Sequence, residues 1–280
     1  MIIRCWGSRG SVPVSGCEYI KYGGDTTCFE IRTEDDQIII VDAGSGIRRL
    51  GNKLLDEGRF EYNLFFTHAH WDHILGFPFF KPIYLPKTRI KIAGCPFSDK
   101  FIKKALNSAM FPPYFPIKLD EIRANVEYDN GNCKNEFRIG SVKVTMIRLS
   151  HPNQGLGYKF TEGDKSFVLL TDNELGFHHK GGRQTLEYQL FTEGADILMH
   201  DSEYTEKEYK TTKKWGHSTF NDAVKLALDA GVKTFGLIHH NQERTDDDLD
   251  KIVLQSKEII QKHNSKMNCL AVAALSEFKL

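Results

Sequence analysis

Short apolar runs recur along the chain and are separated by polar or glycine-containing turns, a pattern typical of sheet proteins. The run Ile2–Trp6 predicts an N-terminal strand, and the segment Gly7–Pro13 after it has the composition of a turn. Two runs on either side of the polar turn Thr33–Asp36 predict a hairpin. The expected strands are 2–6, 28–32, 37–41, 62–66, 89–93, 142–149, 157–161, 166–171, 197–200, 234–238 and one strand within 268–280.

Apolar residues with helical spacing interrupt the strands at four places. The spacing of Ile47, Leu50 and Leu54 predicts one helix, and Thr245 is a suitable N-cap for another. The helices are expected at 47–57, 98–109, 219–230 and 246–262. Since no repeat or linker divides the chain, we expect one α+β domain over residues 1–280, with two packed sheets and helices outside them.

Composition narrows the function classes without selecting one. The 280 residues carry 37 basic and 37 acidic side chains, so the chain lacks the basic excess typical of dedicated polyanion-binding proteins. No apolar run approaches the roughly 20 residues needed to span a bilayer, and the N-terminus does not resemble a signal peptide. The six cysteines form no Cys-x-x-Cys pair, which favours reduced thiols and a cytoplasmic location.

The segment His68–His73 carries the most informative chemistry of the sequence. It holds three imidazoles and the carboxylate of Asp72 within six residues, directly after the predicted strand 62–66. Zn²⁺, Mn²⁺ and Fe prefer these ligand types. A loop at the end of a rigid strand also suits catalysis. The segment therefore predicts metal binding rather than a chance grouping of polar surface residues.

A two-metal site needs about six or seven protein ligands, and residues farther along the chain offer the missing ones. His151, Asp172 and His239 each follow a predicted strand, as His68–His73 does. Taken singly, Asp172 could be only a turn former, and His151 is equally compatible with a structural role. Their shared place at strand ends favours one site at a common sheet edge.

The remaining histidines divide into candidates and residues with simpler explanations. His217 precedes a predicted helix, where it could be a ligand, an acid or a helix-flanking residue. His200 and Asp201 follow an apolar run and also lie at a strand end. Solvated loop positions explain His178 and His179, the opposite side of a strand explains His240, and a helix end explains His263.

Taken together, these residues resemble the metallo-β-lactamase superfamily. The resemblance is carried, in the family's order along the chain, by Asp42 in Val41–Gly44, the segment His68–His73, His151, Asp172 and His239. Three further features are similar to the ribonuclease Z and cyclic phosphodiesterase branch, namely the turn Gly7–Gly10, the pair His200-Asp201 and the tetrad Gly216–Thr219.

The resemblance implies a four-layer αββα sandwich with two divalent ions between the sheet edges. Zn²⁺ is the expected metal, with Mn²⁺ or Fe as alternatives. Asp42 would orient the ligand loop from behind. The implied ligands are His68, His70 and His151 for one ion, Asp72, His73 and His239 for the other, and Asp172 as the bridge.

Two departures from the branch concern the substrate. Asp201 stands where the branch usually has Glu, and His240–Arg244 replaces the Ser/Arg-rich run of the tRNA-processing members. The continuation Asp246–Asp248 is more similar to small-molecule cyclic phosphodiesterases. We therefore expect a small or cyclic phosphodiester as substrate, either a cyclic nucleotide or a phosphoribosyl cyclic phosphate.

The expected mechanism divides the chemistry between metals and side chains. Two metals can hold a bridging hydroxide and both sides of a phosphodiester. His217 is the candidate acid for the leaving group, with Asp201 favouring its charged form, and Asp72 is counted among the catalytic residues as well as the ligands. Arg9 and Tyr114 are candidate substrate contacts for phosphate and for a base or sugar, although the segment around Tyr114 could equally be core.

Two other functions remain open at this point. The first is a tRNA 3′-end endonuclease of the ribonuclease Z type, and the second is a non-hydrolytic metal-binding or redox protein. The loop Phe177–Arg183 is the best candidate for a tRNA-binding arm, but it is short, so tRNA is the less favoured partner. A β-lactamase fits poorly because Asp72 occupies the place that those enzymes usually modify. A homodimer is compatible with the sequence.

Overall fold

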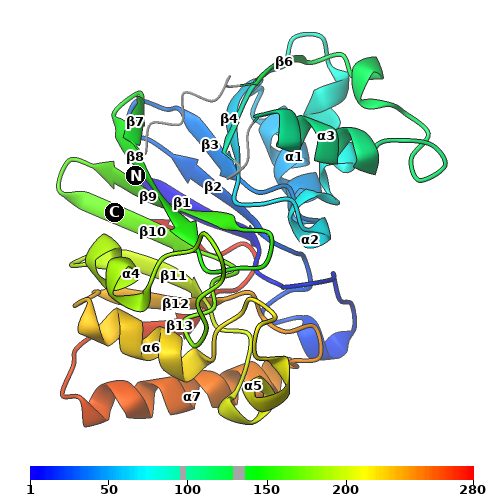
Figure 1. The fold of residues 1–280 in the computed structure, drawn as a ribbon. Helices are drawn as coiled ribbons and strands as arrows, with labels where there is room; N and C mark the ends of the chain where they lie inside the picture. Colours follow the sequence, from blue (N-terminus) through cyan, green and yellow to red (C-terminus); the bar gives the residue numbers. More distant parts are fainter. Residues whose placement is uncertain (95–98, 129–135) are drawn as a thin grey trace.

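Two sheets lie face to face in the computed structural model, which describes residues 1–94, 99–128 and 136–280 (Figure 1). The first sheet has the order β14 (Glu277–Lys279), β1 (Ile2–Gly7), β2 (Cys28–Arg32), β3 (Ile38–Val41), β4 (Glu61–Phe66), β5 (Arg89–Gly94) and β6 (Asn125–Tyr128). The second has the order β13 (Asn268–Ala271), β12 (Thr234–Ile238), β11 (Ile197–Asp201), β10 (Lys165–Leu170), β9 (Gly155–Glu162), β8 (Val142–Leu149) and β7 (Glu136–Ile139).

Helices cover the outer face of each sheet (Figure 1). The first sheet carries α1 (Ile47–Asp56), α2 (Trp71–Ile74) and α3 (Asp99–Ala109), and the second carries α4 (Thr185–Thr192), α6 (Phe220–Asp229) and α7 (Asp246–Lys262). Helix α5 (Glu206–Thr212) buries none of its residues and lies between β11 and α6 in the chain. Short 3₁₀ turns complete the connections at η1 (Cys17–Tyr19), η2 (Phe77–Phe79), η3 (Lys81–Tyr84) and η4 (Leu119–Glu121). The predicted αββα sandwich is confirmed.

Three layers of buried apolar side chains hold the four layers of the sandwich together. Strand β3 is buried on both faces, and its sequence therefore shows no alternation of apolar and polar residues. Ile38 and Ile40 pack under the helices of the first sheet, whereas Ile39 and Val41 face the second sheet. The period-two alternation of a strand therefore assigns each apolar residue to one of two cores.

Most of the predicted elements agree with the structure, and β8, β12 and α7 have the predicted bounds. Residue 98, the predicted start of α3, lies outside the described residues. No pattern of apolar residues predicts β6, β7, α4 or α5, which are short and of mixed polarity. The single strand predicted within 268–280 is in fact two, β13 and β14, and they belong to opposite sheets.

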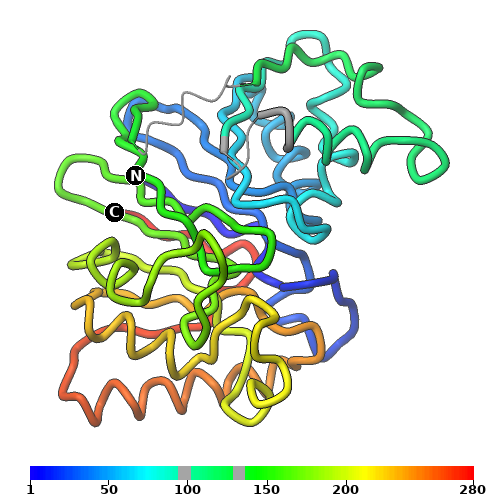
Figure 2. The backbone as a smooth tube through the Cα atoms, viewed as in Figure 1, coloured from blue at the N-terminus to red at the C-terminus, as the bar shows by residue number. Residues whose placement is uncertain are grey.

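The C-terminal segment ties the two sheets together by crossing from one to the other. It also brings the chain ends side by side, as Figure 2 shows, and the amino group of Met1 donates to the carbonyl of Leu280 at 3.2 Å. In the residues that the structure describes, none of the helices combines the length and apolarity required of a membrane span.

The strands that precede the candidate site residues end at one rim of the sandwich. Parallel pairing aligns Val41 with Phe65 in the first sheet and Asp201 with Ile238 in the second. Two hydrogen bonds join the sheets near this rim, from the Leu156 amide to the Thr67 carbonyl at 2.9 Å and from the Tyr158 hydroxyl to the Phe66 carbonyl at 2.7 Å. The segments that follow these strands therefore converge.

The inter-sheet core should be a major source of stability. Phe65 is 2% exposed between the sheets, where it stacks on Tyr158 and meets Phe137 edge to face. Phe65→Ala should lower the free energy of unfolding by about 3–5 kcal/mol, because it leaves a cavity. Ile20→Ala, at a residue that is 77% exposed, should change it by less than about 0.5 kcal/mol. Equal shifts in urea unfolding for both variants would contradict this role of the core.

Candidate metal centre

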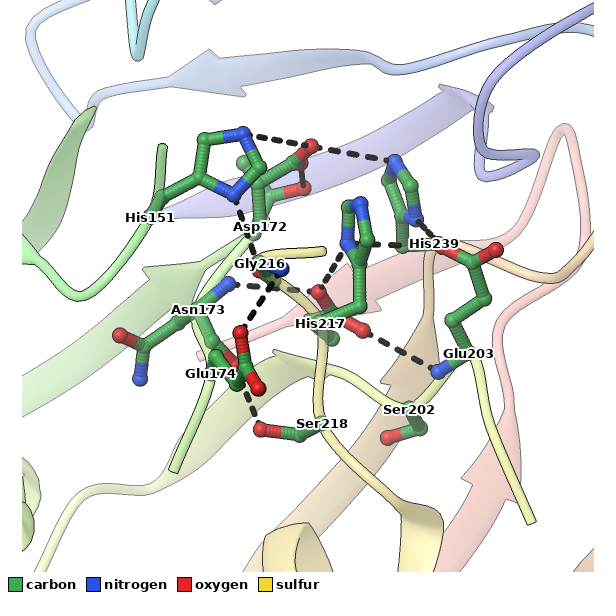
Figure 3. A network of polar contacts seen from close by, with 12 residues as sticks. His151, Asp172, Asn173, Glu174, Ser202, Glu203, Gly216, His217, Ser218 and His239 are labelled. Atoms are coloured by element: carbon green, nitrogen blue, oxygen red, sulfur yellow. Dashed lines mark hydrogen bonds and ion pairs between the residues drawn. The ribbon is translucent and has the colours of Figure 1, made fainter. Parts of the chain in front are cut away.

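Two groups of ligand-type side chains meet at the rim where the strands end, and they share one carboxylate. Within each group the nearest nitrogen and oxygen atoms lie within 4.8 Å of one another. Figure 3 shows His151 and His239 on either side of Asp172, the shared residue. The first group is His68, His70, His151 and Asp172, and the second is Asp72, His73, Asp172 and His239. The structure thus brings together all seven residues expected to bind metal.

Sharp backbone turns aim three of the site's side chains. Asp42, Asp172 and His239 have φ angles of 64°, 45° and 58°, in the left-handed region that residues other than glycine rarely adopt. Each comes one or two residues after the end of a strand. Such conformations cost free energy and persist where the surrounding structure imposes them, most often at functional sites.

The histidines of the first group have little tendency to carry a proton. Burial lowers the pKa of His68 well below its usual value, and it lowers the pKa of His151 to about 3. Nδ1 of His151 lies 2.9 Å from the carbonyl of Gly216, to which it donates, so Nε2 points toward the cluster. Neutral imidazoles with one nitrogen held from behind are in the form that a metal requires.

The second group has an excess of negative charge. Burial alone would lower the pKa of His73, but Asp172, Asp72 and Asp42 raise it well above its usual value. Burial would likewise raise the pKa of Asp172, but His239 and His73 bring it well below the usual range. The carboxylates of this group are therefore stabilised by a nearby positive charge. Either a proton on an imidazole or a divalent cation could supply that charge.

Two buried nitrogen atoms show that the residues present fit a metal. Nε2 of His68 and Nε2 of His73 are inaccessible to solvent and make no hydrogen bond of good geometry with the described residues, although both face carboxylate oxygens. They lie 3.6 Å and 3.1 Å from the carboxylate oxygens of Asp172. A buried polar atom without a partner is costly, and a metal ion between these atoms would remove that cost.

Carboxylates accept hydrogen bonds from Nδ1 of two of the proposed ligand histidines. Asp42 accepts a hydrogen bond from Nδ1 of His73 at 2.8 Å and two more from the amide and hydroxyl of Thr67, as its predicted role requires. Glu203 holds His239 in the same way, with 2.9 Å between Oε2 and Nδ1. Sequence reasoning missed Glu203, because nothing near it in the sequence marks it as the partner of His239, which lies 36 positions farther along the chain.

His217 lies against both ligand groups. Its ring is stacked 4.6 Å from that of His239 and lies 5.2 Å from that of His151 (Figure 3). Nδ1 faces Asp201 at 2.7 Å and Glu203 at 3.4 Å. Burial would lower the pKa of His217, but the charges of Glu203 and Asp201 raise it to about 9.

The side chains of Asp201, His217 and His239 also lie close enough to hold an ion. Two contacts disfavour that use. Nδ1 of His239 is bonded to Glu203, and its Nε2 lies 3.3 Å from Asp72 and Asp172. His239 therefore has no nitrogen left for a third site, and the Asp201–His217 pair is free for other chemistry.

Glu174 is a second residue that sequence reasoning missed. It is 1% exposed and accepts hydrogen bonds from the amides of Lys214 and Gly216, the hydroxyl of Tyr209 and Nε2 of His179, at 2.6–2.8 Å. The carboxylate therefore fixes the turn that leads into His217. A Cβ at Gly216 would lie 2.2 Å from Nδ1 of His151, so only glycine allows this approach.

Two expectations require correction. Arg9 is fully buried and donates to the carbonyls of Gly23, Asn241 and Arg244, so it does not face a substrate. Instead, the backbone of the same turn reaches the site, where the amide of Ser11 donates to Asp72 at 2.9 Å.

The second correction concerns His179, which was expected in solvent but is paired with Glu174 at 2.7 Å. The segment around Tyr114 is neither wholly core nor wholly surface. Phe115 packs edge to face on Phe79, whereas Tyr114 is 81% exposed, and its predicted contact with a substrate stays a prediction.

Comparison with known proteins agrees with this geometry. The family model described as "Beta-lactamase superfamily domain" matches residues 38–240, well over half of the chain. The chain belongs to the metallo-β-lactamase superfamily, a family of hydrolases. A similar curated protein is the ribonuclease Z of Picrophilus torridus, 24% identical over 90% of this chain and 89% of that protein.

Solved structures share the fold along the whole length of this superfamily member. The metallo-β-lactamase fold protein YhfI from Bacillus subtilis has a TM-score of 0.69 at 16% identity, covering 99% of this chain and 98% of that one. The short form of human tRNase Z has a TM-score of 0.63 at 18% identity, covering 100% and 99%. These likenesses establish the fold and leave the substrate open.

The contact between Glu203 and His239 can be tested through metal affinity. Glu203→Gln should weaken Zn²⁺ binding roughly 10- to 100-fold, because the carboxylate that orients and polarises the imidazole is lost. Glu61→Gln, at a side chain that is 78% exposed, is the control and should bind as the wild type does. Competition with a chromogenic chelator measures both. Unchanged affinity in Glu203→Gln would show that Glu203 does not support a ligand.

Proposed function

We propose that this chain is a metal-dependent phosphodiesterase that hydrolyses a small or cyclic phosphodiester in the cytoplasm, with residues 1–280 as one hydrolase domain. The observation that carries the proposal is the Asp201–His217 pair, packed against two groups of metal-ligand side chains. The first group would hold one ion and the second another, with Asp172 between them. A phosphodiester needs both a nucleophile and an acid, and this arrangement offers a place for each.

Two divalent ions bound here would supply a water-derived nucleophile at neutral pH and neutralise charge that develops on the phosphoryl oxygens. The protein's own part is to place a proton at the leaving oxygen. Nδ1 of His217 donates to Asp201, so Nε2 is the atom left to deliver that proton. Asp201 and Glu203 favour the imidazolium, while Asp201 is itself fixed by the amides of Asn173 and Glu203 at 3.2 and 3.1 Å.

The compact form of the loop Phe177–Arg183 favours the proposal that the substrate is small. It folds back on the protein: Nε2 of His178 meets the carbonyl of Gly182 at 3.1 Å, and the Ser150 hydroxyl donates to the carbonyl of Phe177 at 2.7 Å. The loop does not have the form of a projecting arm. A large polyanion would have to be held by some other part of the surface.

A tRNA 3′-end endonuclease is the second candidate, because several similar curated proteins are named ribonuclease Z. One local feature is compatible with it. Lys210, Lys213 and Lys214 are exposed on the segment that leads to His217. These lysines could contact either one nucleotide or the end of a longer chain.

His217→Ala separates an acid from a ligand. With a poor leaving group the variant should lose roughly 10²- to 10⁴-fold in kcat, and the loss should shrink with p-nitrophenolate, which needs little protonation. Both metals should remain bound. Equal losses on the two substrates would mean that His217 positions phosphate instead, and loss of metal would make it a ligand.

Substrate size separates the two candidate functions. We expect specificity constants on a panel of 2′,3′- and 3′,5′-cyclic nucleotides to exceed those on precursor tRNA at moderate salt, because the loop Phe177–Arg183 is short and folded back and does not form an arm that could hold the tRNA. If tRNA is preferred by more than about tenfold, roughly 1.4 kcal/mol in transition-state stabilisation, the ribonuclease function replaces the present proposal.

A further inference from the structure

Two exposed tryptophans flank the candidate metal centre. Trp71 is 60% exposed and lies between His70 and Asp72, both members of the ligand groups. Trp215 is 62% exposed and directly precedes Gly216 and His217. Trp6, the third tryptophan, is by contrast buried, since it is 8% exposed and its indole donates a hydrogen bond to Glu30.

One imidazole separates the backbone segments that carry the two indoles. Nε2 of His151 lies 3.0 Å from Nδ1 of His70, and Nδ1 of His151 lies 2.9 Å from the carbonyl of Gly216. Trp71 follows the first of these partners and Trp215 precedes the second. The backbone of both tryptophans therefore lies at the same rim of the site, and the contacts of one proposed ligand, His151, join the two segments.

Each tryptophan is attached to backbone that the structure already fixes. The Trp71 carbonyl accepts the amide of Leu75 at 2.8 Å within α2. The Trp215 amide donates to Thr212 at 3.0 Å, and Glu174 holds the amides on both sides of it. A side chain on rigid backbone loses little freedom when a ligand covers it, so these indoles are suited to binding.

The neighbouring charge indicates what kind of ring would bind. Lys213 and Lys214 are exposed beside Trp215, and Nζ of Lys214 lies 5.5 Å from the ring centre of Phe177. A ligand at this rim would thus meet aromatic faces and positive charge together. A nucleotide has both complementary features, a base with two π faces and an anionic phosphate.

We propose that Trp71 and Trp215 bind the base of a nucleotide substrate and so determine specificity for nucleotides over base-free sugar phosphates. The inference rests on the proposed phosphodiesterase function and refines its substrate class. Stacking on a tryptophan is sequence-tolerant, because purines and pyrimidines alike present π faces. The pair should accordingly distinguish the presence of a base more strongly than its identity.

The test compares 5′-AMP with ribose 5-phosphate, which lacks the base, by calorimetric titration of the Zn²⁺-loaded protein. The wild type should bind AMP more tightly, and AMP should quench indole fluorescence. Trp71→Ala and Trp215→Ala should each weaken AMP binding roughly 5- to 150-fold and leave ribose 5-phosphate binding unchanged. Trp71→Phe and Trp215→Phe should restore most of the AMP affinity, which also excludes misfolding as the cause.

Three results would overturn the inference: equal affinities of the wild type for the two ligands, unchanged AMP affinity in the alanine variants, or equal losses for both ligands. Hydrolysis of 2′,3′-cyclic AMP and of base-free ribose 2,3-cyclic phosphate is measured separately. Turnover of both without preference would uphold the phosphodiesterase function and remove the role of the tryptophans. Base-dependent binding without turnover of either cyclic phosphate would uphold the role of the tryptophans in base binding and contradict the phosphodiesterase function.

Discussion

The carboxylate of Asp172, contacted by histidines from both sheets, is the interaction on which the candidate centre depends. Its oxygens lie 3.1 Å from Nε2 of His73, which follows a strand of the first sheet, and 3.3 Å from Nε2 of His239, which follows a strand of the second. These contacts exist only if the two sheets keep their relative position. The inter-sheet core around Phe65 and Tyr158 is therefore a condition for the chemistry as well as for stability.

The two ligand groups differ in their electrostatics although they share Asp172. Histidines dominate the first group, and burial keeps them neutral. The second adds Asp72 to Asp172 and is backed by Asp42 and Glu203, so it concentrates negative charge. A cation would be held most strongly in the second group, while His217 lies beside both groups and is paired with Asp201.

Much of this arrangement was predictable because the signals are local. His68–His73 has its ligand spacing within one segment, and His151, Asp172 and His239 follow apolar runs that read as strands. Parallel pairing of β10, β11 and β12 places Asp172 and His239 at one edge of the second sheet, and the packing of the two sheets brings them to His68–His73. The same reasoning failed for β6 and β7, whose four residues each alternate in exposure and carry too little apolar signal.

The residues that sequence reasoning missed act through contacts between distant segments. Glu203 meets His239 across 36 positions, and Glu174 meets Gly216 across 42. No local pattern marks a carboxylate as the partner of a particular imidazole or amide. The prediction that Arg9 contacts the substrate was wrong for a related reason. The turn that carries Arg9 reaches the site through the backbone amide of Ser11, whereas the Arg9 side chain donates its hydrogen bonds to backbone carbonyls.

The most direct test of the two-metal centre is a crystal structure of the metal-replete protein with diffraction recorded at the metal's absorption edge. We expect two anomalous peaks per chain, one among His68, His70 and His151 and one among Asp72, His73 and His239, with Asp172 between them. A single peak, or a peak held by Asp201 and His217, would contradict it.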